Sequence, residues 1–124
     1  MEDTSSNIPG NNRRLEEPQD AIGFHERGNR YSRNGAYERA IEDYNRAIEM
    51  DGAFAEAYYD RGFSFYEMAR YEEAIADLTR AIELNPEAAH YYGQRSLVYL
   101  FTDRLDLAQA DEEMSDTLRN RGLE

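Results

Sequence analysis

The sequence predicts an all-α fold, an α-solenoid in which three helix–turn–helix units supply six helices. The first observation is a period of 34 residues, because residues 21–54 align with residues 55–88 and a third unit follows from Ala89. The second is that small and apolar residues recur within each unit at spacings of three and four, which is one face of a helix. The third is that turn or helix-stop pairs separate these faces, at Asn34-Gly35, Asp51-Gly52 and Asn85-Pro86.

The elements follow in chain order from a polar start. Residues 1–19 lack a helical period, and we expect a disordered N-terminal tail there. Asp20 is placed to cap the first helix, and Pro18 disfavours an earlier helical start. The array is predicted over residues 20–121, in units 21–54, 55–88 and 89–122. The expected helices are Ala21–Asn34, Tyr37–Met50, Ala55–Ala69, Tyr71–Leu84, Ala89–Thr102 and Leu105–Arg119.

The last helix departs from the two before it in the pattern. Glu112 stands where the earlier units have Tyr44 and Leu78, and Ser115 stands where they have alanine. We expect both polar side chains to lie on the face that a following unit would cover, so that this helix caps the array.

An arginine and an aspartate recur 16 residues apart in every unit. The arginine lies beside the small residue of the first helix, and the aspartate lies between the packing alanines of the second. We interpret them as ion pairs that fix the register of the two helices rather than as ligand sites. The pairs are Arg27–Asp43, Arg61–Asp77 and Arg95–Asp111.

The chain resembles the tetratricopeptide repeat family over about 100 of its 124 residues. The second unit carries the family's pattern in full: Tyr58, Gly62, Phe65, Ala74, Leu78, Ala81 and Pro86. The first unit carries it with Gly52 in place of the proline: Phe24, Gly28, Tyr31, Ala40, Tyr44 and Ala47. The third unit carries part of it: Tyr92, Ser96, Tyr99 and Ala108. The resemblance implies a right-handed superhelical array whose first helices line a concave groove for a protein partner.

The resemblance places the groove at four positions in the first helix of each unit. Among them, Tyr59, Phe63 and Tyr66 form an aromatic stripe beside the packing positions. The stripe either packs on the next unit at Leu97 and Leu100, or is exposed as an apolar patch with an acidic rim. The exposed alternative suits a segment with aliphatic anchors and some basic residues. The predicted groove residues are Asn29, Tyr59, Phe63, Tyr66, His90 and Leu97.

The family's carboxylate clamp for the acidic tails of chaperones is not predicted here. By the resemblance, the clamp needs a basic residue and an asparagine, then an asparagine, then two basic residues. Asn29 fits, but His25, Asp60, His90 and Gln94 stand at the other positions. Asp60 would face the ligand's carboxylate with like charge, and histidines that are neutral near pH 7 would not offset it.

Composition argues against several other functions. The chain has a net charge of −12, and all 14 of its basic residues are arginine, so nucleic acid and anionic membrane surfaces are not expected partners. It has no cysteine and only two histidines, so we expect no metal site, and we expect no cofactor and no enzyme activity. No secretory signal or membrane-spanning run is visible, which makes the cytoplasm the default location.

Two functions remain open from the sequence. The chain is either an adaptor that binds a partner protein in its groove, or an assembly module whose groove is filled by a second copy, as in a homodimer, or by its own N-terminal tail.

Overall fold

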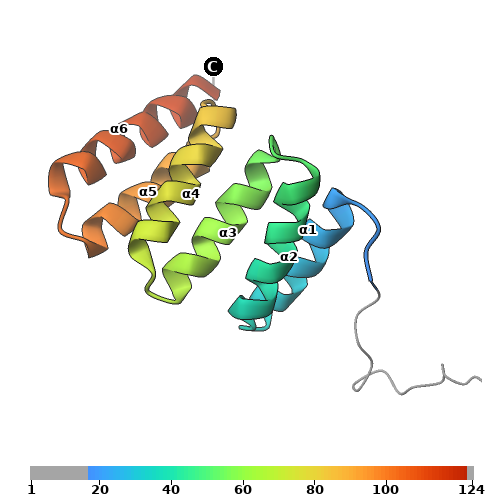
Figure 1. Ribbon diagram of the computed structural model, residues 1–124. Coiled ribbons are helices and arrows are strands. Elements are labelled where there is room, and N and C mark those ends of the chain that lie inside the picture. The colour runs from blue at the N-terminus through green and yellow to red at the C-terminus, as the bar shows by residue number, and fades with distance from the viewer. Residues whose placement is uncertain (1–16, 123–124) are drawn as a thin grey trace, which may run out of the picture.

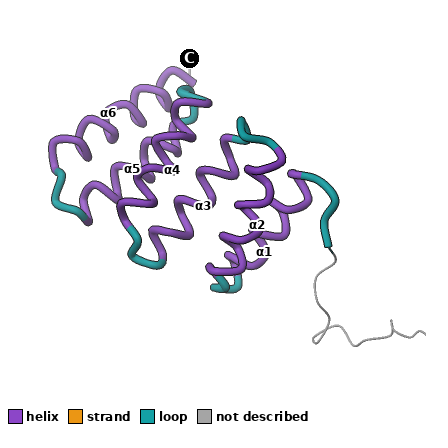
Figure 2. The backbone as a smooth tube through the Cα atoms, in the orientation of Figure 1, coloured by secondary structure: helices purple, strands orange, loops and turns teal. Residues whose placement is uncertain are grey.

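The computed structural model describes residues 17–122, and these residues form six helices joined by short turns. Figure 2 shows helices and loops only, with no strand in this part of the chain. The helices are α1 (Ala21–Arg33), α2 (Tyr37–Met50), α3 (Ala55–Glu67), α4 (Tyr71–Leu84), α5 (Ala89–Phe101) and α6 (Leu105–Gly122). The tail predicted for residues 1–19 falls mostly outside the described range.

The helix starts agree with the sequence prediction, whereas α1, α3 and α5 end one or two residues earlier than expected and α6 extends to Gly122. Asp20 caps α1, since its side chain accepts a hydrogen bond of 2.8 Å from the amide of Gly23. Ala69 was expected at the end of α3, but that helix stops at Glu67 and Ala69 lies exposed in the turn with a φ of 60°. Its counterpart in the first unit is Gly35, with a φ of 80°, so the turn requires a left-handed residue.

The helices pack in pairs, and the pairs stack in a row with α1 and α6 at opposite ends (Figure 1). Within the described chain the first helices also contact one another, α1 with α3 and α3 with α5, whereas α2, α4 and α6 do not. A row that is closer-packed on one side curves toward that side. The first helices therefore line the concave face, as the resemblance implied.

Small residues let each helix pair approach closely. A Cβ added at Gly28 would lie 2.7 Å from the ring of Tyr44, and one added at Gly62 would lie 3.1 Å from the side chain of Leu78. The alanines of the second helices are fully buried at these crossings: Ala40, Ala47, Ala74 and Ala81. The repeated small residues thus set the spacing of the array.

The three arginine–aspartate pairs form inside their own units, as predicted. In the central pair, Arg61 Nε and Nη2 donate to the two carboxylate oxygens of Asp77 at 2.8 and 2.7 Å. Burial raises the pKa of Asp77, although the Arg61 guanidinium opposes that shift, and the hydrogen bond to Asp77 raises the pKa of Arg61. A buried bidentate pair of this kind fixes the crossing of the two helices.

The end helix corrects one expectation. Glu112 is exposed on α6, as predicted, but Ser115 is fully buried. Its hydroxyl lies 3.5 Å from where a Cβ at Gly93 would be, so Ser115 packs inside its own unit against α5. Ser115 is therefore buried within the third unit, and its polarity does not mark an outer face.

Candidate functional site

The aromatic stripe of α3 lies on the concave face and is half-buried along its length. Tyr59 stacks on Tyr91 of α5 with the ring centroids 5.1 Å apart, and it meets the edge of His90 at 4.8 Å. This end of the stripe therefore packs on the next unit. The ring contacts of Tyr59 are with Tyr91 and His90 of α5.

The remaining stripe residues, Tyr66 and Phe63, differ in their aromatic contacts. The ring of Tyr66 lies 6.2 Å from that of Tyr71 and 5.6 Å from that of Phe101, and Tyr66 packs against the core. Phe63 has one ring contact among the described residues, with Tyr66 at 6.1 Å. Phe63 is thus the stripe residue with the least aromatic packing.

A histidine and an aspartate bridge the first two units across the groove. His25 of α1 and Asp60 of α3 meet at 2.6 Å between Nε2 and a carboxylate oxygen, and both are largely shielded, with 14% and 23% of their side chains exposed. Asn29 lies beside them, but its amide oxygen accepts a 2.6 Å hydrogen bond from the hydroxyl of Tyr44. Asn29 is therefore held by the protein itself.

A glutamate bridges the second and third units in the same way. Glu56 of α3 lies 3.2 Å from the ring nitrogen of His90, and it accepts a 2.7 Å hydrogen bond from the hydroxyl of Tyr91. Glu56 and His90 are about half exposed, so their polar atoms remain within reach of a ligand. Leu97 is half-buried on the same helix as His90, one turn beyond Gly93.

Two carboxylates lie close to the stripe at Tyr59. Burial raises the pKa of Tyr59, and the nearby carboxylates of Asp60 and Glu56 raise it further. Gln94 adds a buried amide nitrogen that has no hydrogen-bond partner in the described chain. The polar groups within reach of a ligand here thus include two partly exposed carboxylates, Asp60 and Glu56, which can pair with a cation, whereas the Gln94 nitrogen is buried.

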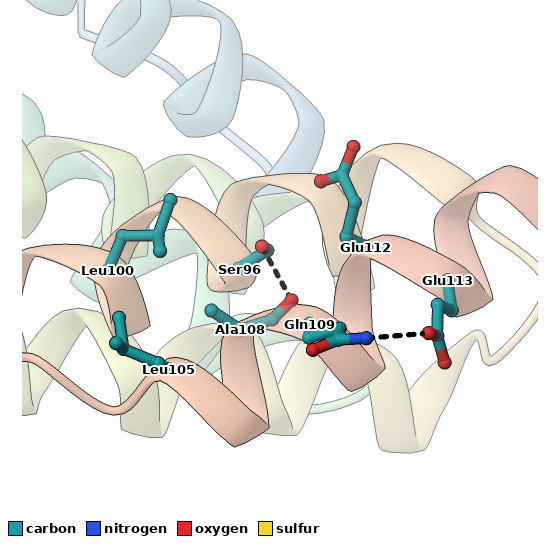
Figure 3. Close-up of a pocket in the computed structure, with 7 residues that line it drawn as sticks. All are labelled: Ser96, Leu100, Leu105, Ala108, Gln109, Glu112 and Glu113. Atoms are coloured by element: carbon teal, nitrogen blue, oxygen red, sulfur yellow. Dashed lines mark hydrogen bonds between the residues drawn. The ribbon is translucent and has the colours of Figure 1, made fainter.

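Sequence reasoning missed two features, one buried and one on the surface. Tyr91 is fully buried, and its ring packs on Tyr59 where α3 meets α5. Its position next to Tyr92, a packing position of the repeat, was the sequence feature that could have indicated this burial. A pocket of about 260 Å³ also opens outside the groove, between α5 and α6 (Figure 3). It is lined by Ser96, Leu100, Leu105, Ala108, Gln109, Glu112 and Glu113.

Residues 17–122 contain neither a metal-binding cluster nor a membrane-spanning helix. No cluster of three or more acidic or histidine side chains is arranged to hold a metal ion in this range. Among the described helices, none combines the length and apolar character needed to cross a bilayer.

Comparison with known proteins gives one consistent family. A family model described as "TPR repeat" matches residues 28–69, and one described as "Tetratricopeptide repeat" matches residues 55–88. No curated protein matches the chain.

Several solved structures are similar over most of the chain. The second TPR of Spaghetti (RPAP3), bound to the HSP90 peptide SRMEEVD, is 37% identical with a TM-score of 0.78, over 81% of this chain and 93% of that one. The second TPR domain of human RPAP3, in complex with the HSP70 peptide SGPTIEEVD, is 37% identical with a TM-score of 0.76, over 79% and 82%. The Arabidopsis OM64 TPR domain is 25% identical with a TM-score of 0.79, over 82% and 84%.

Proposed function

This chain belongs to the tetratricopeptide repeat family, and we propose that it is an adaptor whose concave groove binds a segment of a partner protein. The family's fold is a protein–protein interaction module, and its similar structures bind peptides. The half-buried aromatic stripe between two carboxylates supports the same use here, because apolar anchors framed by polar groups are typical of peptide grooves.

We further propose that the ligand is not an acidic chaperone tail. The relatives' peptides end in glutamate, valine and aspartate, which requires cations in the groove. At the corresponding positions this chain has His25 engaged by Asp60 at 2.6 Å and Asn29 engaged by Tyr44. An incoming carboxylate would meet Asp60 and Glu56, and no described arginine replaces the missing cations at the clamp positions.

The same geometry favours a segment with lysine or arginine next to an apolar anchor. Two unit charges about 4 Å apart interact by about 4 kcal/mol at the effective dielectric of a protein surface, before desolvation and salt reduce that gain. We expect about 1.5–2 kcal/mol of it to survive, which is at least a tenfold preference for a basic over an acidic peptide. The observation that carries the proposal is Asp60, held against His25 where the clamp has an uncharged asparagine.

A matched pair of peptides tests this chemistry by fluorescence anisotropy. One is SRMEEVD, and the other is SRMKKVK with an amidated end, which keeps the methionine and valine and inverts the charges. The basic peptide should bind at least about tenfold more tightly. Asp60→Asn should abolish most of that preference, whereas Asp116→Asn, an exposed change on α6, should leave it intact.

A second set of variants tests the negative half of the proposal. His25→Lys, Asp60→Asn, His90→Lys and Gln94→Arg together rebuild the clamp around Asn29. The rebuilt chain should gain binding to SRMEEVD that the natural chain lacks. Binding of SRMEEVD by the unaltered chain with an affinity equal to that of the rebuilt one would overturn the proposal.

The anchor is tested by a separate substitution. Phe63→Ser should weaken binding of the basic peptide. It should leave the melting temperature of the protein nearly unchanged, because Phe63 has one ring contact in the described fold. Tyr66→Ser is unsuitable alone, since Tyr66 packs against Tyr71 and Phe101. If Phe63→Ser melts the protein instead, the stripe belongs to the core and the groove loses its anchor.

A further inference from the structure

The units of this array are joined by a repeated pair of contacts. Counted from residues 21, 55 and 89, the seventh residue of a unit reaches the twenty-fifth residue of the unit before it. Arg61 Nη1 donates to Asn45 at 2.8 Å, and Arg95 Nη1 donates to Thr79 at 3.0 Å. The tenth residue packs near the twenty-fourth, since Val98 lies in one core cluster with Leu78.

At the α6 end, the twenty-fourth and twenty-fifth positions, which the next unit contacts elsewhere in the array, are both glutamates. Glu112 is the twenty-fourth residue of the third unit and Glu113 is the twenty-fifth, and both are exposed. They border the 260 Å³ pocket, whose apolar wall includes Leu100 and Leu105, 52% and 58% exposed (Figure 3). One period earlier, the equivalents of these leucines, Tyr66 and Tyr71, pack against the cluster that contains Val98. The pocket is therefore the vacant counterpart of an internal joint of the array.

At the α1 end, the seventh and tenth positions, which contact the preceding unit elsewhere in the array, are both arginines. Arg30 is the tenth residue of the first unit, where the later units have the fully buried Ser64 and Val98. Arg30 is exposed, and its guanidinium has no hydrogen bond or ion pair with any other residue in the range 17–122. Arg27, the seventh residue, has its Nη1 3.3 Å from Glu17, whose side chain is 67% exposed.

We propose that two copies of this chain dock head to tail, with α1 of one copy seated on α6 of the next in the register that the units use internally. Arg30 then enters the pocket beside Glu112, and Arg27 exchanges the exposed Glu17 for Glu113 of the other copy. The α1 end presents positive charge and the α6 end presents negative charge. The internal register of the units would place these opposite charges next to each other. The occupant is thus a second copy.

The symmetry of this contact follows from the fold. Because α1 and α6 lie at opposite ends of the row (Figure 1), one copy can use both faces at once. Such a heterologous contact does not close on itself unless the rotation permits, so it yields growing oligomers rather than a single dimer. The net charge of −12 opposes association at long range, so assembly depends on protein concentration. Charged outer faces also keep repeat arrays soluble, and that alternative is an outcome of the test.

Charge reversal on the full chain separates the alternatives, with mass measured by sedimentation over a range of protein concentrations. The unaltered chain should rise above 14.4 kDa as concentration increases. Arg30→Glu and Glu112→Arg should each weaken association at least tenfold, because each creates a like-charge pair at the joint. An equimolar mixture of the two variants should associate again, since both possible joints then carry opposite charges. Glu42→Arg, an exposed change on α2, is the control and should associate normally.

Three results would overturn the proposal. The unaltered chain could stay at 14.4 kDa at every concentration, which leaves solubility as the role of the charged ends. Both reversals could associate like the unaltered chain, which places the contact elsewhere. The mixture could remain monomeric while the unaltered chain associates. If both variants also keep their helical circular dichroism, that result would show that Arg30 and Glu112 do not pair across the joint. Binding of the SRMKKVK peptide to the groove is measured in parallel. None of these three results bears on it, so the groove proposal can stand or fall separately.

Discussion

Removal of Arg61 tests whether the buried ion pairs hold the array together. Arg61→Ala deletes two hydrogen bonds to Asp77, at 2.8 and 2.7 Å, and the 2.8 Å bond to Asn45 of the preceding unit. Asp77 stays behind with 8% of its side chain exposed, so water cannot replace the lost partner without opening the crossing. Leaving one member of a buried pair uncompensated costs about 3–5 kcal/mol.

Urea unfolding followed by circular dichroism measures this loss. With an m-value of about 1.5–2 kcal/mol/M for a chain of this size, the unfolding midpoint should fall by about 2 M. Arg119→Ala is the matched control, because its contact with Asp116 is 3.8 Å long and exposed, and it should change stability by less than about 0.5 kcal/mol. The double change Arg61→Met with Asp77→Leu should recover much of the loss, since it leaves no buried charge.

The pH dependence of the same variant adds an independent check. Burial raises the pKa of Asp77 and Arg61 lowers it, so loss of Arg61 raises that pKa further. A raised folded-state pKa means that ionised Asp77 costs stability above that value and costs nothing once it is protonated in both states. The deficit of Arg61→Ala should therefore shrink as the pH falls from 7 toward 4. An unchanged midpoint at pH 7, or a deficit that grows in acid, would refute the role assigned to the pair.

Three further predictions concern the backbone, the helix crossing and the surface. Ala69→Gly should raise the free energy of unfolding by about 1 kcal/mol, because the turn holds this residue at a φ of 60°, and a loss of stability in thermal melts would contradict that reading. Gly28→Ala should lower it by about 1–3 kcal/mol, since the new Cβ would lie 2.7 Å from the Tyr44 ring, and a stabilised variant would show that the crossing has slack. Sodium chloride should raise the melting temperature, because salt screens repulsion among surplus carboxylates at distances beyond about 10 Å at 0.1 M; a flat or falling trend would show that this repulsion is negligible.

The fold could be predicted from the sequence because its determinants are local and periodic. The 34-residue period fixed the units, and the small residues at Gly28 and Gly62 indicated where helices cross. The pairing of Arg61 with Asp77 followed from one spacing that recurs in every unit. Ser115 was misplaced because the period shows that a position is special without showing which neighbour it meets.

The groove was harder to predict because its contacts join residues of different units. His25 and Asp60 are 35 residues apart, and their 2.6 Å contact depends on how far α1 and α3 rotate against each other. The stripe was offered as either exposed or packed, and the structure shows why neither alternative is complete. Tyr59 packs on Tyr91, whereas Phe63, one turn further along the same helix face, contacts only Tyr66 among the rings of the described chain.

Amide chemical-shift mapping of the full chain with SRMKKVK-amide tests the central claim, that the concave face is the partner site. The peptide should shift residues of the first helices, foremost Asp60 and Phe63 of α3 and His90 of α5, and the shifts should saturate with a single affinity. The amides of α2 and of the α6 end should move little. Saturating shifts confined to α6, or none at peptide concentrations up to the millimolar range, would contradict it.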